Sequence, residues 1–152
     1  MRTVLKFGLS LALVLVLSVA LFVAFVSGVG GLYPHDHGQL SVSVDGEEID
    51  FDRPEYHDRH PTFHFHEGGG QVWHHHPESP TKFTEFERMT VEEAMATLDI
   101  EVTASSVTID GTTYDDADPG STVTITMNGE SADPAVHRLH DGDAVEIRVV
   151  TD

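Results

Sequence analysis

The chain has 152 residues, enough for one membrane segment and one small domain but too few for a multidomain enzyme. It carries 26 acidic residues against 8 basic ones, a formal net charge of −18 that excludes nucleic acid and anionic lipid headgroups as partners. It has no cysteine, so disulfides and thiolate metal sites are excluded, and any metal ligand must be His, Asp or Glu.

The N-terminal segment, residues 1–32, has Arg2 and Lys6 as its only charges, followed by a mostly apolar run over 7–32. A helix needs about 20 such residues to cross a bilayer, so the pattern predicts a membrane anchor. A cleaved secretory signal is the alternative, although signal cores usually have about 7 to 15 residues. The two basic residues predict a single-pass cell-membrane protein with its N-terminus in the cytoplasm and its C-terminal domain outside.

The acidic residues all follow Tyr33, where only six basic residues remain. They are spread among regular apolar patterns instead of standing in blocks, and Lys82 is the only lysine after the anchor. This distribution favours the solvated surface of a protein made for high salt over a disordered acidic tail. We therefore expect a halophilic source.

Residues 33–38 are predicted to form a linker, and residues 39–152 the exported domain. The Asp45-Gly46 pair lies between alternating segments, a strong hairpin signal, and predicts strands over 39–44 and 47–51. A polar loop follows over 52–62, and FHFHE and QVWHHH are the next strand candidates.

The hydrophobic period changes over 89–98, where Thr90 and Glu93 have capping-box spacing. Strand patterns return at 105–114, 121–130 and 143–150, and Asp-Gly and Asn-Gly pairs mark turns in the first two. The order predicts an α+β fold, a mostly antiparallel β-sheet with one short helix packed on it. The helix is predicted to present one apolar face to the sheet, made of Val91, Ala94, Met95 and Leu98.

The last third of the chain, VTITMNGESADPAVHRLHDGDAVEIRVV, resembles the closing part of the ubiquitin-like and sulfur-carrier β-grasp proteins. Both have a strand, an Asn-Gly-Glu turn, a variable stretch and a Gly-Asp turn into a final strand. The resemblance implies a β-grasp-like fold. Those families end in an activated Gly-Gly tail, whereas this chain ends VVTD, so conjugation and sulfur transfer are not expected.

Three segments, HDHGQLSVSVDGEEIDF, FHFHEGGGQVWHHH and VTITMNGE, also resemble a group of uncharacterised exported domains. In that group an N-terminal histidine precedes a first hairpin, and an HxH(D/E) strand precedes a second histidine strand. The resemblance implies no reaction, but it implies a set of matching positions: His35, His37, His64, His66 and His74.

The two histidine runs at 63–67 and 71–76 flank three glycines, which predict a hairpin loop. With a three-residue loop His64 lies opposite His74, whereas a loop one residue longer would pair His64 with Trp73. We favour the first register because it separates an apolar face that buries cleanly from a polar one. The faces are then Phe63, Phe65 and Trp73 against His64, His66, His74 and His76.

Opposed histidines of such a hairpin lie about 5 Å apart at Cβ, a workable distance for shared binding of a metal. Neutral imidazole binds Zn²⁺ and Cu²⁺ well, so one of these ions is the expected ligand. His35 and His37 could add ligands, and Glu67 could ligate or orient one. The competing interpretation is a solvated polar face whose alternation produces the HxH spacing without a metal.

The remaining histidines are expected outside the site: His57 and His60 at the surface of a loop, and His137 and His140 in a turn. The motifs H-E-x-x-H, G-x-S-x-G, G-x-G-x-x-G and the P-loop are all absent, so neither catalytic residues nor an organic cofactor is predicted.

Together these patterns predict a membrane-anchored extracytoplasmic domain that binds a divalent metal for sequestration, delivery or sensing. Two alternatives stay open. One is a metal-free module that binds another membrane or cell-surface protein, and the other is a hydrolase with a His-bound metal.

Overall fold

The computed structural model describes residues 16–19, 34–77 and 87–152. Residues 16–19 are helical, and the rest of the predicted anchor, 1–32, lies outside the described residues. Within the described part of the chain, no helix is both long and apolar enough to cross a membrane. The chain divides into two compact units, Met1–Pro34 and His35–Asp152, and all the strands described below belong to the second.

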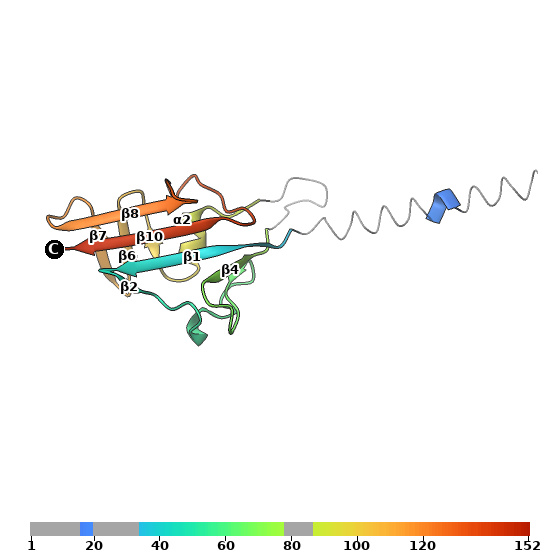
Figure 1. Ribbon diagram of the computed structural model, residues 1–152, viewed down its shortest axis with the longest axis horizontal. Coiled ribbons are helices and arrows are strands. Elements are labelled where there is room, and N and C mark those ends of the chain that lie inside the picture. Colours follow the sequence, from blue (N-terminus) through green and yellow to red (C-terminus); the bar gives the residue numbers. More distant parts are fainter. Residues whose placement is uncertain (1–15, 20–33, 78–86) are drawn as a thin grey trace, which may run out of the picture. The chain divides into compact units, whose positions relative to one another are not determined.

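Within the unit His35–Asp152 the described residues, 35–77 and 87–152, form mostly β-sheet with one short α-helix and one 3-10 turn, in agreement with the predicted α+β class (Figure 1). Its elements are β1 (Asp36–Val44), β2 (Glu47–Glu48), η1 (Pro54–Tyr56), β3 (Phe63–His64), β4 (Val72–His75), α2 (Val91–Ala96), β5 (Glu101–Val102), β6 (Ser106–Ile109), β7 (Thr112–Asp115), β8 (Ser121–Met127), β9 (Glu130–Ser131) and β10 (Ala144–Thr151).

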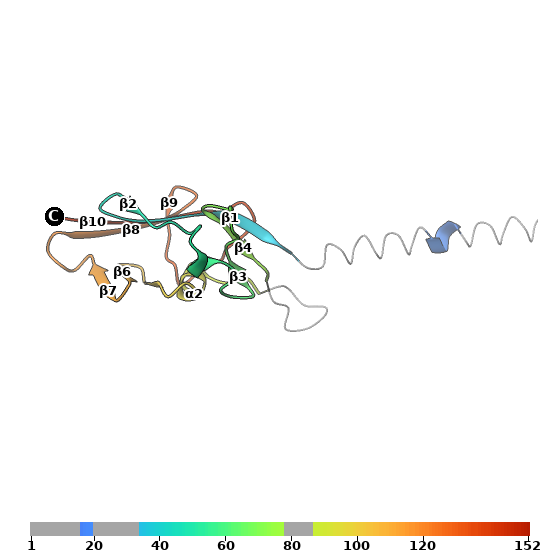
Figure 2. The same cartoon turned by 90° about the horizontal axis from the view of Figure 1, so that it is seen from below.

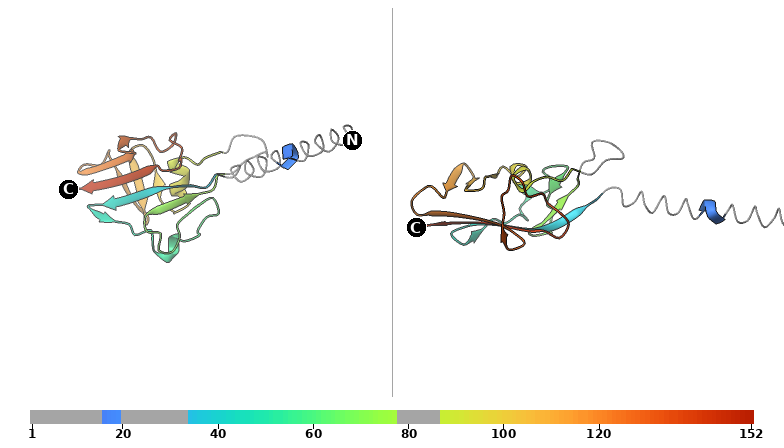
Figure 3. Two further views of the ribbon diagram at one scale, coloured as in Figure 1. Left: turned by 45° about the vertical axis from the view of Figure 1, so that its right-hand side comes forward. Right: turned by 90° about the horizontal axis from the view of Figure 1, so that it is seen from above.

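The larger sheet has the strand order β3-β4-β1-β10-β8-β9, and β2 also pairs with β1. At its centre β1 and β10 are parallel, from Gln39↔Ala144 to Val44↔Val149. A smaller antiparallel sheet is formed by β5, β6 and β7. Figure 2 and Figure 3 show the long strands as one layer and α2 with β6 and β7 as a second layer. The hydrophobic core draws residues from both layers, among them Val42 and Ile147 of the large sheet and Met95 of α2.

The predicted tight turns are present at three Asp-Gly or Asn-Gly pairs. Their first residues have positive φ, 52° at Asp45, 50° at Asp110 and 55° at Asn128, a conformation that Asp and Asn tolerate better than most residues. Each turn connects two antiparallel strands, β1 with β2, β6 with β7 and β8 with β9. The hairpins were therefore predictable from two-residue signals.

Several predicted strand boundaries are wrong: β3, for example, ends at His64 although the strand candidate extends to Glu67. Two of the differences depend on distant partners. β1 begins at Asp36 instead of Gln39, because its first residues pair with β4 from Asp36↔His75 to Gln39↔Val72. The strand after the first turn ends at Glu48 instead of Phe51. Phe51 is fully buried outside the sheet ladder, and its ring stacks on that of Phe65 with centroids 4.8 Å apart. In both places a distant partner decides the boundary.

The predicted capping box of α2 is confirmed. Thr90 Oγ1 accepts a hydrogen bond from Glu93 N at 3.2 Å, and Thr90 N donates one to Glu93 Oε2 at 2.8 Å. The predicted apolar face is also confirmed, since its four residues are all buried: Val91, Ala94, Met95 and Leu98.

The substitution Thr90→Ala is expected to lower the free energy of unfolding by about 1 kcal/mol, because it leaves the Glu93 amide without its capping acceptor. Denaturant unfolding at high salt would measure the loss. Thr90→Ser keeps the hydroxyl and should retain most of the stability. An equal loss in both variants would show that the cap contributes nothing.

Candidate metal centre

Three neighbouring strands carry histidines on one face of the larger sheet. His74 on β4 lies opposite His64 on β3 and opposite His37 on β1, so these side chains form one row across the strands. The predicted hairpin register, with His64 opposite His74, is confirmed. The opposite face is buried by Phe63, Phe65 and Trp73, as predicted. Alternation brings three more histidines to the open face: His35, His66 and His76.

The histidines on this face touch one another and form what we call the histidine cluster. His74 occupies its centre, with ring centroids 4.6 Å from His37 and 4.3 Å from His66. His76 lies 4.1 Å from His35 and 5.3 Å from His64, which joins the two sides of the cluster. All the predicted ligand positions are therefore brought together: His35, His37, His64, His66, His74 and His76.

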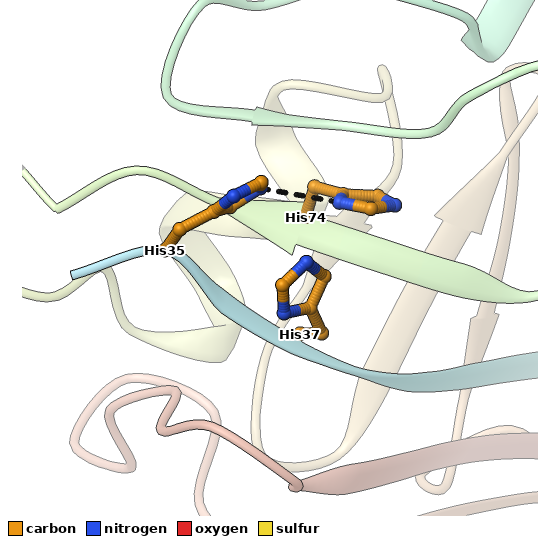
Figure 4. Close-up of side chains that lie close together, drawn as sticks. All are labelled: His35, His37 and His74. Carbon is orange, nitrogen blue, oxygen red and sulfur yellow. Dashed lines mark hydrogen bonds between the residues drawn. The ribbon is translucent and has the colours of Figure 1, made fainter.

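One part of the cluster, His35, His37 and His74, offers three ring nitrogens that all lie within 4.8 Å of one another (Figure 4). His74 Nδ1 and His35 Nε2 form a hydrogen bond of 3.2 Å, the dashed line in Figure 4. Two nitrogens bound about 2.0 to 2.1 Å from one ion, at an angle of about 90 to 110°, lie about 2.9 to 3.4 Å apart. This pair therefore also has the spacing of adjacent metal ligands, and a bound ion would replace the hydrogen bond between the two rings.

Asp141, in the loop before β10, orients His37. Its Oδ1 accepts a hydrogen bond from the His37 backbone amide at 2.9 Å and lies 3.6 Å from His37 Nδ1. A carboxylate next to one ring nitrogen leaves the other, Nε2, to bind a metal and increases its basicity. Sequence reasoning missed Asp141, because it approaches β1 only through the pairing of β1 with β10.

Burial and mutual repulsion keep several imidazoles uncharged. Burial, and then repulsion from His66 and His37, lower the pKa of His74 to about 4. The pKa of His35 is also lowered by burial and then by His76. Neutral imidazole is the form that binds divalent ions, so these ligands need not lose a proton at neutral pH before binding a metal.

A second group on the same face contains a carboxylate: Asp58, His64 and His66 offer one ligand atom each, again within 4.8 Å. Sequence reasoning named both histidines but missed Asp58. It proposed Glu67 as the carboxylate instead, and Glu67 is exposed in the hairpin loop and belongs to neither group.

The histidines expected outside the site differ in their placement. His57 and His60 are partly buried instead of exposed. The His60 carbonyl accepts a hydrogen bond from His64 Nδ1 at 3.0 Å, so His60 supports the cluster through its backbone. His137 and His140 are exposed and bond within their own turn, as expected.

His75 is a buried histidine that sequence reasoning did not single out. It is 0% exposed, on the same face as Trp73, and its Nε2 accepts a hydrogen bond from Met89 N at 3.4 Å. Asp36 lies beside it, with 4.0 Å between His75 Nδ1 and Asp36 Oδ2, and Asp36 accepts a hydrogen bond from Arg88. Burial lowers the pKa of His75 to about 4 despite the nearby carboxylate. The alternation that buries Trp73 already assigns His75 to the core.

Comparison with protein-family models, with curated proteins and with solved structures gave no match for this chain. The interpretation of the histidine cluster therefore depends on its own geometry and donor chemistry.

Proposed function

We propose that this protein binds a divalent transition metal ion, Cu²⁺ or Zn²⁺, through its histidine cluster, for sequestration, delivery or sensing. The observation that carries the proposal is the group of three histidines, His35, His37 and His74, whose ring nitrogens lie within 4.8 Å of one another. The pKa values of His74 and His35 are lowered, in both cases first by burial, and Asp141 Oδ1 lies 3.6 Å from His37 Nδ1. A merely solvated face would not need ring nitrogens at ligand spacing.

The donor set favours these two ions. Imidazole suits Zn²⁺ and Cu²⁺, and Cu²⁺ has the highest affinity of the divalent first-row ions for a given site. Cu⁺ prefers thiolate and thioether sulfur, and the chain has no cysteine. We therefore propose a site for Cu²⁺ instead of Cu⁺, as expected outside the cytoplasm.

The proposed setting is a β-grasp-like domain held outside a halophilic cell by an N-terminal anchor. Support for the anchor comes from the apolar run over 7–32, and support for high salt comes from the net charge of −18. The parallel central pair β1 and β10, with the capped helix across one face of the sheet, supports the β-grasp part of the proposal.

Titration of the full chain, solubilised in detergent at high salt, with Cu²⁺ and Zn²⁺ tests the proposal. The double variant His35→Ala/His37→Ala is expected to bind a metal at this group about 100-fold more weakly than the wild type, because it leaves one ligand of the group. The matched control is His137→Ala, which removes an exposed histidine whose ring bonds to Asp133 in its own turn, and this variant should bind as the wild type does.

Equal affinity and an equal number of bound ions in the cluster variant and the control would overturn the proposal, as would wild-type binding weaker than about 0.1 mM. The metal-free interaction module would then be the better interpretation, and its binding to a partner protein would persist in the presence of a chelator.

A further inference from the structure

We infer that the histidine cluster holds two metal ions, the second bound by Asp58, His64 and His66. The inference rests on the proposed function, since it assigns a second site beside the one formed by His35, His37 and His74. The two groups share no residue, and each brings its ligand atoms within 4.8 Å.

The cluster has more donor atoms than one ion can bind. Zinc sites in proteins take about four ligands at about 2.0 to 2.1 Å, so donors of one ion lie at most about 4.1 Å apart. The cluster offers six imidazoles in a closed ring of contacts, together with Asp58 at its edge. One ion would leave about half of these donors unused, whereas two ions use both groups.

The backbone places Asp58 at the site. Asp58 N donates to Phe65 O at 3.1 Å, and Phe65 N donates to Tyr56 O at 3.4 Å, so the loop before β3 runs beside the hairpin. Asp58 has a φ of 46°, which turns the chain there. Its Oδ1 lies 3.5 Å from His66 Nδ1. Chain pairing thus fixes the backbone of Asp58 beside the hairpin, and the exposed carboxylate lies next to His66.

His64 is oriented as a ligand. It is 7% exposed, and its Nδ1 donates to the His60 carbonyl at 3.0 Å. That hydrogen bond fixes the tautomer and leaves Nε2 with a free electron pair, the arrangement typical of metal-binding histidines. A histidine that only interacted with solvent would not need a buried ring with one nitrogen bonded to a backbone carbonyl.

The two sites differ in the ions that they favour. The first group is all imidazole and has no formal charge, which suits Cu²⁺. The second adds a carboxylate, a harder and negatively charged donor, so it shifts preference towards Zn²⁺ and other ions that accept mixed nitrogen and oxygen ligands. His76 lies between the groups, in ring contact with His35 and His64, and can supply a further ligand to either ion.

Zinc stoichiometry tests the inference. The full chain in detergent at high salt is loaded with Zn²⁺, desalted and analysed for zinc per chain, and the titration is followed by calorimetry. We expect two ions in the wild type and one in Asp58→Asn, a variant that tolerates positive φ but removes the charge. His66→Ala, at an exposed side chain, should give the same result and serves if Asp58→Asn does not fold. The variant His35→Ala/His37→Ala should also retain one ion.

The outcomes separate the two proposals. The wild type could bind one ion that Asp58→Asn and His66→Ala keep and that His35→Ala/His37→Ala loses. This result would overturn the second site and leave the proposed function standing. One ion that is lost in every variant also overturns it, because the cluster would then be a single shared site. The absence of bound zinc and copper in the wild type overturns the proposed function itself.

Discussion

Replacing Gly38 with alanine is expected to lower the free energy of unfolding by about 3 kcal/mol or more, because the added methyl group overlaps closely packed neighbours. A Cβ at this position would lie 2.1 Å from Asp143 O and 2.3 Å from Trp73 Cζ2. Neither neighbour can move away without weakening a hydrogen bond. The Asp143 carbonyl accepts a hydrogen bond from Gln39 N at 2.9 Å, and Trp73 is fully buried with its Nε1 donating to Gln39 O at 3.2 Å.

Thermal or denaturant unfolding at high salt measures the effect, and Gly46→Ala is the matched control. Gly46 has a φ of 83° with no atom within 4 Å of an added Cβ, so that variant carries only backbone strain of about 1 to 2 kcal/mol. If Gly38→Ala is no more destabilising than Gly46→Ala, the close packing of Trp73 on β1 is not rigid. A destabilised Gly38→Ala should also bind metal weakly, because His37 on β1 and His74 on β4 would lose their register.

The metal-free protein is expected to lose stability steeply as the pH falls from 6.5 to about 4. Burial lowers the pKa of His75 from 6.5 to about 4 in the folded chain. Between these values the unfolded chain binds a proton that the folded chain does not, so the free energy of unfolding decreases as the pH is lowered. The contribution is fully present above pH 6.5 and is lost by about pH 4. It amounts to about 3 kcal/mol for this fully buried group.

Denaturant unfolding at pH 7 and at pH 4.5 in the presence of a chelator measures the difference. His75→Gln removes the titration while keeping an acceptor for the Met89 amide, so the pH dependence of the variant should be shallower. His74, whose pKa is also lowered to about 4, acts in the same direction and remains in the variant. Parallel pH profiles for the wild type and His75→Gln would contradict the assignment.

Local signals predicted the hairpins, the capped helix and the face of the histidine strands. The register of β3 with β4 followed from burying Phe63, Phe65 and Trp73 together, and the structure has that register. The same alternation assigns His75 to the core, on the buried face that carries Trp73. Two-residue turn signals and the alternation of side chains along a strand were sufficient here, because the paired strands are close in the sequence.

The rest of the candidate site depends on pairing between distant segments. Sequence reasoning offered His35 and His37 as further ligands without a geometry, because nothing local says that β1 lies beside β4. Asp58 reaches His66 through a loop pairing with Phe65, and Asp141 reaches His37 from before β10. The packing of the whole sheet determines these contacts, and no short sequence pattern predicts them.

The parallel pairing of β1 with β10 sets an order of events during synthesis. β1 carries His37 and lies between β4 and β10, so the strand that bears one side of the histidine cluster is enclosed only when residues 144–151 are available. Contacts between segments about a hundred residues apart form slowly, since the loop between them must close first. A nascent chain therefore carries all the proposed ligands, which lie within residues 35–76, before β10 can hold β1 in the complete sheet.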